Sequence, residues 1–392
     1  MAGLTAECTP SGTAGYNVIL GDEKGMINKE RMQRAEDSLT AYRNQIEDFL
    51  SRYVGAKADA FKEVESLGEE TGRLIEDFIL DGGKRTRAAF TYYGYCAAGG
   101  EDGENILFAS AAIEILHNFF LIHDDIVDKS DLRRGLPTIH ARYKQIYENK
   151  GLIFNFNNDG KIDLPSAMAI INGNICCALA YEAFVESGFQ ADKILQVLEM
   201  MYDIIKYTAV GQLLDIVKAT TRKATEEEVL RIHYLKTAKY SVEGPLCVGA
   251  ILTGTTSSVL DSLSRYAIPV GMAFQIHDDI LGIFGTEEQM GKSIVSDTKE
   301  GKQTLLTVKA LENASPSQKE RLEHFIGNPD ITKADIEEVK SIIEETGALE
   351  YSRMKEISLS EEGKKALLYT PIREDIKDIL LGTADLLIER EC

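Results

Sequence analysis

The chain has 392 residues, of which 44% are hydrophobic, and its 43 Lys+Arg against 63 Asp+Glu give a net charge of -20. An acidic balance of this size argues against a nucleic-acid partner, which would need a basic surface. The six cysteines include no pair with CxxC spacing, so they indicate neither a zinc site nor a disulfide framework, and we expect a protein of the reducing cytoplasm.

Most of the chain carries the apolar spacing of helices. We expect residues 1–28 to form an N-terminal extension that is disordered, and residues 29–392 to form a single all-helical domain. We also expect no signal peptide and no membrane-spanning helix, since a span needs roughly 18 apolar residues. Helical spacing is clearest in Ala35–Tyr53, Thr71–Leu80, Ile106–Asp128, Ile194–Ala219 and Leu260–Phe284.

One segment departs from this pattern. Residues 149–166, NKGLIFNFNNDGKIDLPS, are rich in Asn, Gly and Asp, which is typical of a surface insertion, with a small hairpin on the NDG turn. A role as a lid or an interface is the alternative to a simple surface loop.

The first group of charged residues lies in FFLIHDDIVDKSDLRRG, residues 119–135. Asp124 and Asp128 are four residues apart, so on a helix they share one face. Like charges so placed repel each other, but Mg²⁺ would use them, because it prefers hard oxygen ligands and fills the rest of its shell with water and substrate phosphates. Acidic pairs also occur on solvated helix faces, so this motif alone leaves both interpretations open.

A second group changes that balance. FQIHDDILGIFG, residues 274–285, places Asp278 and Asp279 after an apolar run and repeats the IHDD of the first group. Both pairs lie near the C-terminal end of a predicted helix, where the helix dipole disfavours an anion. Two such unfavourable features pointing into one cavity would clamp one diphosphate through several Mg²⁺ ions.

Basic residues accompany both groups. They are Lys84, Arg85 and Arg87 in GGKRTR, Arg133 and Arg134 after the first aspartates, Lys236, and Lys292 and Lys302 after the second aspartates. Arginine binds phosphate oxygens through two parallel hydrogen bonds, and lysine acts as a point charge. These residues suffice for two diphosphates, one held through metals and one by direct basic contacts, although each lysine alone also fits a solvated surface.

In combination these motifs resemble the trans-isoprenyl diphosphate synthase family, and the resemblance runs from about Ser38 to the C-terminus. It rests on GGKRTR, DDIVD, RRG, GQLLD at 211–215, Lys236–Thr237, and the FQxxDD block followed by GK and EGK. The resemblance implies the all-α isoprenoid synthase fold, with ten or more helices around a deep central cavity, usually in a homodimer. It also implies a prenyltransferase that joins isopentenyl diphosphate to an allylic diphosphate.

The resemblance assigns roles to individual residues. Isopentenyl diphosphate would be bound by Lys84, Arg87, His117 and Arg134. The allylic diphosphate would be bound by Arg133, Lys236, Thr237, Gln275, Lys292 and Lys302. Magnesium would be bound by Asp124, Asp128 and Asp278, with Asp125, Asp279 and Asp215 in support. The catalytic set would be Asp124, Asp128, Asp278, Arg133, Lys236, Thr237 and Gln275.

Two positions depart from the family pattern. Gly282 stands where many members have a third aspartate, and we expect no loss of activity from it. Asn174 stands where an aspartate is usual, which puts one supporting contact in doubt.

The implied chemistry needs no protein nucleophile. The allylic carbon–oxygen bond breaks, the double bond of isopentenyl diphosphate attacks the resulting cation, and a proton is lost to the released diphosphate. We therefore expect His123 and His277, each beside an aspartate pair, to pack or hydrogen-bond locally rather than act as general bases.

Product length is predicted from two aromatic residues. Phe120 lies one helical turn before Asp124 on the same face, and Phe119 flanks it, so a growing product tail would meet both rings. Aromatic residues at both positions resemble the farnesyl-producing type, whereas an aromatic at only the earlier position is common among geranylgeranyl producers. We predict a fifteen-carbon product, with the twenty-carbon product as the alternative. The remaining interpretation is that both rings are ordinary core residues.

Two other functions fit the sequence less well. A terpene cyclase would not need the second basic site of Lys84, Arg87 and Arg134, and its usual Asn/Ser/Glu metal motif is not found. A non-catalytic partner subunit tends to lose the first aspartate group or the RRG, and this chain keeps both.

Overall fold

The structure is a computed structural model that describes residues 28–151, 163–286 and 293–389. The predicted N-terminal extension up to residue 27, the predicted hairpin at the NDG turn and Lys292 lie outside these residues. The first helix begins where the sequence predicts the domain to begin, because the side chain of Asn28 caps it by accepting a hydrogen bond from the backbone N–H of Arg31.

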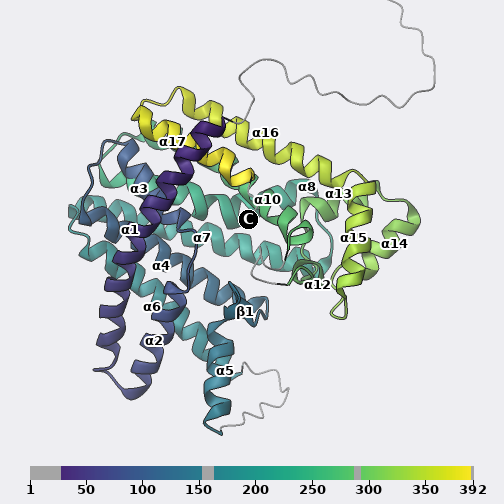
Figure 1. The fold of residues 1–392 in the computed structure, drawn as a ribbon, viewed down its shortest axis with the longest axis horizontal. Coiled ribbons are helices and arrows are strands. Elements are labelled where there is room, and N and C mark those ends of the chain that lie inside the picture. The colour runs from purple at the N-terminus through teal and green to yellow at the C-terminus, as the bar shows by residue number, and fades with distance from the viewer. Residues whose placement is uncertain (1–27, 152–162, 287–292, 390–392) are drawn as a thin grey trace, which may run out of the picture.

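The predicted all-α class and the predicted number of helices are confirmed (Figure 1). The first half of the chain forms α1 (Lys29–Phe61), α2 (Ser66–Leu80), α3 (Thr86–Ala97), α4 (Glu104–Val127), α5 (Ile139–Asn149), α6 (Leu164–Glu186) and α7 (Ala191–Thr221). The second half forms α8 (Glu226–Ile232), the π-helix η1 (His233–Glu243), α9 (Gly244–Leu252), α10 (Ser257–Phe284), α12 (Ser296–Glu300), α13 (Leu305–Asn313), α14 (Pro316–Phe325), α15 (Lys333–Glu345), α16 (Ala348–Leu368) and α17 (Glu374–Ile388). Within the described ranges, strand is confined to the short antiparallel pair β1 (Leu132–Arg133) and β2 (Leu136–Pro137).

Local sequence explains where several helices begin. Thr225, Thr304, Ser315 and Thr332 each form a capping box, in which the cap side chain and the third helical residue satisfy each other's backbone N–H groups. Each of the five predicted helical segments lies within a longer observed helix, apart from the last residue of one segment, Asp128, which caps α4.

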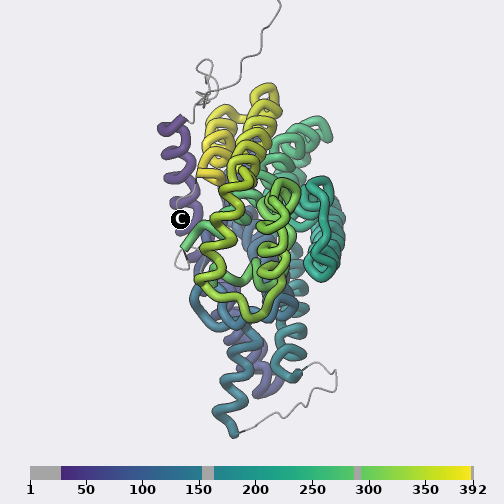
Figure 2. Tube along the Cα trace, turned by 90° about the vertical axis from the view of Figure 1, so that its right-hand side faces the viewer, coloured from purple at the N-terminus to yellow at the C-terminus, as the bar shows by residue number. Residues whose placement is uncertain are grey.

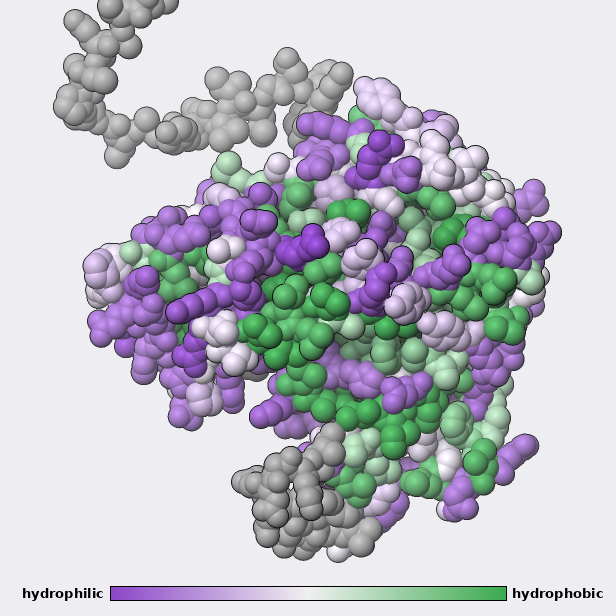
Figure 3. Space-filling view, turned by 180° about the vertical axis from the view of Figure 1, so that it is seen from behind, coloured by the Kyte–Doolittle hydropathy of each residue, from purple (hydrophilic) through white to green (hydrophobic). Residues whose placement is uncertain are grey.

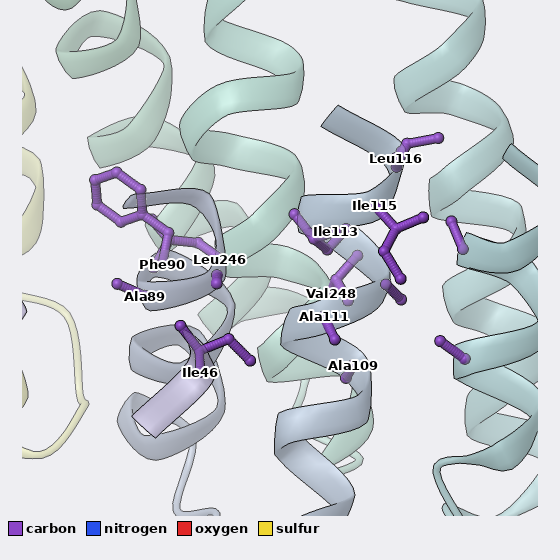
Figure 4. Close-up of a cluster of buried hydrophobic side chains, with 14 of the residues drawn as sticks. Ile46, Ala89, Phe90, Ala109, Ala111, Ile113, Ile115, Leu116, Leu246 and Val248 are labelled. Atoms are coloured by element: carbon purple, nitrogen blue, oxygen red, sulfur yellow. The ribbon is translucent and has the colours of Figure 1, made fainter. Parts of the chain in front are cut away.

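The main hydrophobic core surrounds α4. Figure 4 shows Ile113, Ile115 and Leu116 of α4 in one cluster with Phe90 of α3 and Leu246 of α9, with Ile115 and Leu116 on the side of α4 away from Phe90. Because α4 is apolar on almost every side, it is stable only when other helices cover it. A buried Leu or Ile side chain contributes roughly 1.5–3 kcal/mol, so this core fixes the position of α4 firmly.

A second, smaller core lies under α13, α14 and α15, which form one side of the molecule (Figure 1). Helix α10 belongs to both cores: Tyr266 and Val270 pack into the main core, and Ile276 and Ile280 pack into the smaller one. The second aspartate pair therefore lies on the part of α10 that the smaller core holds in place. In contrast, α5 extends away from the body of the protein (Figures 1 and 2).

The expectation that no segment reaches the length of a membrane span was wrong by length and composition. Both α4 and α6 contain an 18-residue apolar window of sufficient hydropathy. However, 72% of the α4 window and 44% of the α6 window are buried inside the fold, where the two helices pack against each other. Core helices of a folded protein pass the same test, and burial is the physical reason for the apolar composition here.

Candidate active site

The first aspartate pair lies at the C-terminal end of α4, as predicted. Asp124 and Asp128 are half-buried and one helical turn apart, and the backbone N–H of Asp128 donates to the carbonyl of Asp124 at 2.8 Å. The amide of Gln212, on α7, donates to Asp124 Oδ1 at 2.8 Å. Asp124 is therefore oriented by a neighbouring helix and still presents its carboxylate at the surface of the site.

The environment of Asp125 differs from that of Asp124 and Asp128. Asp125 is 1% exposed, and the Nε of Arg133, in the β1–β2 hairpin, donates to its Oδ1 at 2.6 Å. Burial raises the pKa of Asp125 to about 7 in spite of the guanidinium. In this geometry Asp125 anchors Arg133 beside Asp124, and its supporting role in magnesium binding stays a prediction.

The π-helix η1 brings basic and hydroxyl groups to the same place. Lys236 Nζ donates to Asp215 Oδ2 at 2.7 Å and lies 3.8 Å from Asp124 Oδ1. Burial alone would lower the pKa of Lys236, but Asp124 and Asp215 outweigh it and raise the pKa, so the lysine stays charged. π-Helical segments are rare in proteins, and those that occur are often at functional sites.

The second aspartate pair contains one buried and one exposed carboxylate. Asp279 is 2% exposed and accepts hydrogen bonds from Lys302 at 2.8 Å and Gln275 at 2.9 Å, and His233 Nε2 lies 3.0 Å from its Oδ2. Burial alone would raise the pKa of Asp279, but Lys302 and His233 outweigh it and hold the pKa below its usual range. Asp278, one residue earlier, is exposed and free to face a ligand.

A hydrogen-bonded chain links the two sides of the site. The hydroxyl of Thr237 on η1 donates to Gln275 Oε1 at 2.6 Å, and the amide of Gln275 donates to Asp279. Helix η1 therefore reaches the first aspartate pair through Lys236, and it reaches the second pair through Thr237 and Gln275 and directly through His233.

A separate basic group lies at the start of α3. Arg87 Nη2 donates to the hydroxyls of Tyr240 at 2.9 Å and Ser241 at 2.8 Å, and its Nη1 lies 3.3 Å from His117 Nε2. Burial and the charge of Arg87 hold the pKa of His117 well below its usual value. Arg134 donates to the carbonyl of Gly82, the first residue of the GGKRTR motif that ends at Arg87.

The remaining residues of the GGKRTR motif differ in their surroundings. Lys84 is exposed, whereas Arg85 is buried and lies 3.5 Å from Glu114 Oε2. Burial lowers the pKa of Arg134 to about 10, which leaves this guanidinium charged at neutral pH. Arg85 is therefore engaged in the interior of the fold, and the binding of an anion by Lys84, Arg87 and Arg134 stays a prediction.

The two phenylalanines lie together one turn before the first aspartates. Phe119 and Phe120 are half-buried, with ring centroids 4.9 Å apart. The Phe120 ring also contacts Tyr240 at 5.1 Å, and Tyr240 in turn contacts Arg87. The basic group and the aromatic pair therefore share a neighbour on η1.

The structure gives a physical reason for one departure from the family pattern. A Cβ atom on Gly282 would lie 2.5 Å from Asp297 Oδ2, which is far closer than such atoms approach. Asp297 is 5% exposed and lies 3.8 Å from Lys302 Nζ. The carboxylate of Asp297 thus occupies the space that a side chain at position 282 would need. Asn174, the other departure, lies on the exposed side of α6.

Histidines near the aspartate pairs make local contacts, as predicted. His123 Nε2 lies 3.2 Å from the carbonyl of Ile170, and His277 Nδ1 lies 3.4 Å from Glu356 Oε2. His233 was missed by sequence reasoning, although it lies three residues before Lys236 and helical spacing would have placed it on the same side. Gln212 was given no role although it lies in the GQLLD motif, and Tyr240 was missed as well.

The predicted magnesium ligands lie apart from one another. Among residues 28–151, 163–286 and 293–389, no group of three or more His, Cys, Asp or Glu side chains is close enough to form a metal cluster. Asp124, Asp128 and Asp278 instead offer separate carboxylates at accessible positions. This fits magnesium, which takes one or two protein carboxylates and completes its shell with waters and substrate phosphates. The magnesium assignment and the individual site roles stay predictions.

Comparisons with known proteins show the family. The polyprenyl synthetase family model matches residues 69–345. The chain is 32% identical over 349 residues to a short chain isoprenyl diphosphate synthase of Methanothermobacter thermautotrophicus, covering 88% of this chain and 99% of the relative. It is 32% identical over 343 residues to a geranylgeranyl diphosphate synthase of Methanosarcina mazei, covering 87% and 96%.

A solved structure shows the same fold. The geranylgeranyl pyrophosphate synthase of Corynebacterium glutamicum, complexed with isoprenyl diphosphate and magnesium, aligns with a TM-score of 0.83 and 29% identity, covering 89% of this chain and 99% of that one. Together, the family match over most of the chain, the near full-length relatives and the fold identify the protein. The chain belongs to the polyprenyl synthetase family and is a trans-isoprenyl diphosphate synthase, a prenyltransferase.

Proposed function

We propose that this enzyme is a short-chain synthase that condenses isopentenyl diphosphate with dimethylallyl or geranyl diphosphate in a magnesium-dependent reaction. The observation that supports this most strongly is that both aspartate pairs are joined through neighbouring residues of η1. Lys236 contacts the first pair, and Thr237 reaches the second through Gln275. One allylic diphosphate held between the pairs would thus meet both a fixed cation and a hydroxyl.

The carboxylates of Asp124, Asp128 and Asp278 would hold magnesium with the allylic diphosphate. When bound, magnesium supplies positive charge that stabilises the negative charge developing on the departing diphosphate. Lys236, Arg133 and Lys302 add fixed positive charge, and their buried carboxylate partners hold them in place before the substrate arrives.

Thr237 and Gln275 would face the allylic carbon after the carbon–oxygen bond breaks. The hydroxyl proton of Thr237 is engaged with Gln275 Oε1, so the lone pairs of the Thr237 oxygen stay available to the cation. Their partial negative charge stabilises the cation without forming a bond to it. Isopentenyl diphosphate, held by Lys84, Arg87 and Arg134, then attacks, and the released diphosphate accepts the proton that is lost.

Phe119 and Phe120 would stop the growing tail. Two adjacent aromatic rings favour a fifteen-carbon farnesyl product, whereas the names of the relatives favour a twenty-carbon geranylgeranyl product at least as strongly. In this proposal Phe119 and Phe120 form a wall that limits the length of the product. Replacing both rings with smaller side chains distinguishes such a wall from ordinary core packing.

Product analysis tests this proposal. Purified protein is incubated with isopentenyl diphosphate and either dimethylallyl, geranyl or farnesyl diphosphate, with Mg²⁺ or with EDTA, and chain length is determined by mass spectrometry. We expect Mg²⁺-dependent condensation that ends at fifteen or twenty carbons, and longer products from the Phe119→Ala, Phe120→Ala variant. Unchanged length in that variant would refute the wall, and no condensation with any primer would favour a partner subunit.

We also propose a cytoplasmic homodimer. Exposed apolar side chains recur along α7 at Leu195, Tyr202, Val210, Leu213 and Val217. Figure 3 shows a broad hydrophobic band on the face seen from behind, and Figures 1 and 2 place α7 on this side. Light scattering should give twice the mass of the 43.4 kDa chain. Leu213→Glu should reduce that mass, whereas Met354→Glu, an exposed residue of α16, should leave it unchanged.

A further inference from the structure

The two rings of the aromatic pair have different supports. Phe120 contacts Tyr240 of η1, with ring centroids 5.1 Å apart. Phe119 contacts His123, one turn further along α4, edge to face at 4.8 Å and 83°. An aromatic ring that stops a growing apolar tail must keep its rotamer when the tail presses against it. The residue that packs against each ring therefore determines how strongly that rotamer is fixed.

His123 is attached to a second helix. Its Nε2 lies 3.2 Å from the carbonyl oxygen of Ile170 in α6. A carbonyl oxygen only accepts, so Nε2 carries a proton and donates it to Ile170. The hydrogen bond fixes the orientation of the imidazole ring, because a planar ring with one bonded edge has little freedom to rotate.

Gly173 of α6 makes room for this ring. A Cβ atom at position 173 would lie 2.6 Å from His123 Nε2 and 2.9 Å from Cε1. Any side chain at this position would therefore displace the ring or break its hydrogen bond. The imidazole of His123 thus contacts α6 at two places, the carbonyl of Ile170 and the backbone of Gly173 one turn further along.

We infer that His123 is a positioning residue for product length: held by Ile170 and Gly173 of α6, its ring fixes Phe119 in the wall that ends chain growth. This inference rests on the proposed role of Phe119 and Phe120. It goes beyond that role because it assigns control of product length to α6 and to a histidine that does not meet the substrate. It also explains why the histidine beside the first aspartates is not a general base: its Nε2 proton is engaged with the backbone.

The test is the product distribution of His123→Ala. Losing the ring contact should raise the ratio of longer to shorter products by about three- to tenfold, the factor that an edge-to-face aromatic contact is worth. The rate of the first condensation should stay within about twofold, since no reacting group is removed. His324→Ala, an exposed histidine of α14, is the matched control and should leave the product ratio unchanged.

A double-mutant comparison shows whether His123 acts through Phe119. In a Phe119→Ala background, His123→Ala should cause no further lengthening. A similar lengthening with and without Phe119 would overturn the inference, as would an unchanged ratio in His123→Ala while Phe119→Ala lengthens the product. If Phe119→Ala and the Phe119→Ala, Phe120→Ala variant both leave the length unchanged, the proposed wall itself fails.

Gly173→Ala provides an independent test if His123→Ala folds poorly. The added methyl should change the product ratio when His123 is present and have no effect when residue 123 is alanine, because the methyl then meets no ring. An equal effect of Gly173→Ala in both backgrounds would overturn the inference.

Discussion

Replacing Lys302 with methionine should destabilise the protein by about 3 kcal/mol at neutral pH, because it removes the cationic partner of a buried carboxylate. Asp279 is 2% exposed, and Lys302 Nζ lies 2.8 Å from its Oδ1. Breaking a buried pair on one side costs roughly 3–5 kcal/mol. We expect the lower end, because Gln275 and His233 still contact the carboxylate and the Lys302 side chain is 23% exposed.

The loss should depend on pH in a defined direction. In the wild type the pKa of Asp279 is lowered, so its contribution to stability is present above its unfolded pKa and is lost as the pH falls through the folded pKa. Without Lys302, burial should raise the pKa of Asp279 above its unfolded value. The folded variant then takes up a proton as the pH falls from neutral toward about 5, and the stability gap to the wild type should narrow.

Thermal unfolding in EDTA measures both effects. With an unfolding entropy of roughly 2.1 cal/mol/K per residue, a loss of about 3 kcal/mol lowers Tm by roughly 4 °C in a chain of this length. The Lys302→Met, Asp279→Asn double variant is the control and should recover most of the loss, since no buried charge is left unpaired. A single-variant Tm within about 1 °C of the wild type, or a gap that does not change with pH, would refute this reasoning.

The remaining predictions concern activity. Asp124→Asn should lower kcat by about 100-fold or more in a labelled isopentenyl diphosphate assay while Tm stays near that of the wild type, and an unchanged kcat would remove Asp124 from the metal assignment. Arg87→Lys should raise KM for isopentenyl diphosphate by about tenfold with little effect on KM for geranyl diphosphate, because lysine cannot keep both hydroxyl contacts and present a fork to phosphate. EDTA should abolish turnover and added Mg²⁺ should restore it, whereas turnover that persists in EDTA would contradict the metal requirement.

Local patterns predicted which parts of the chain are helical, but not how the helices pack. The apolar spacing of Ile106–Asp128 identified α4 because a core helix is apolar on almost every side. A helix that is apolar on almost every side also has the length and composition of a membrane span. The burial of α4 inside the fold shows that it is a core helix. The π-helical form of η1 was not predicted, because apolar spacing does not distinguish a π-helix from an α-helix; in the fold η1 packs against α7 and α10.

The candidate site divides in a similar way. Asp124 was identified by its four-residue spacing from Asp128 and by the repeated IHDD, whereas Lys236 and Lys302 were identified through the family motifs. His233 was not, since its partner Asp279 is 46 residues away and only the fold brings them together. Gly282 was recognised as a departure, and the position of Asp297 supplies the reason that the sequence could not.

The central claim is that the two aspartate pairs act on one allylic diphosphate. Calorimetric binding of a thiolo analogue of geranyl diphosphate, which resists ionisation, tests it most directly when the wild type is compared with Asp124→Asn and Asp278→Asn. We predict that tight binding requires Mg²⁺ and that both substitutions weaken it, while binding of isopentenyl diphosphate in EDTA is unchanged. If only one substitution weakens the analogue, the two pairs do not share a ligand and the claim is wrong.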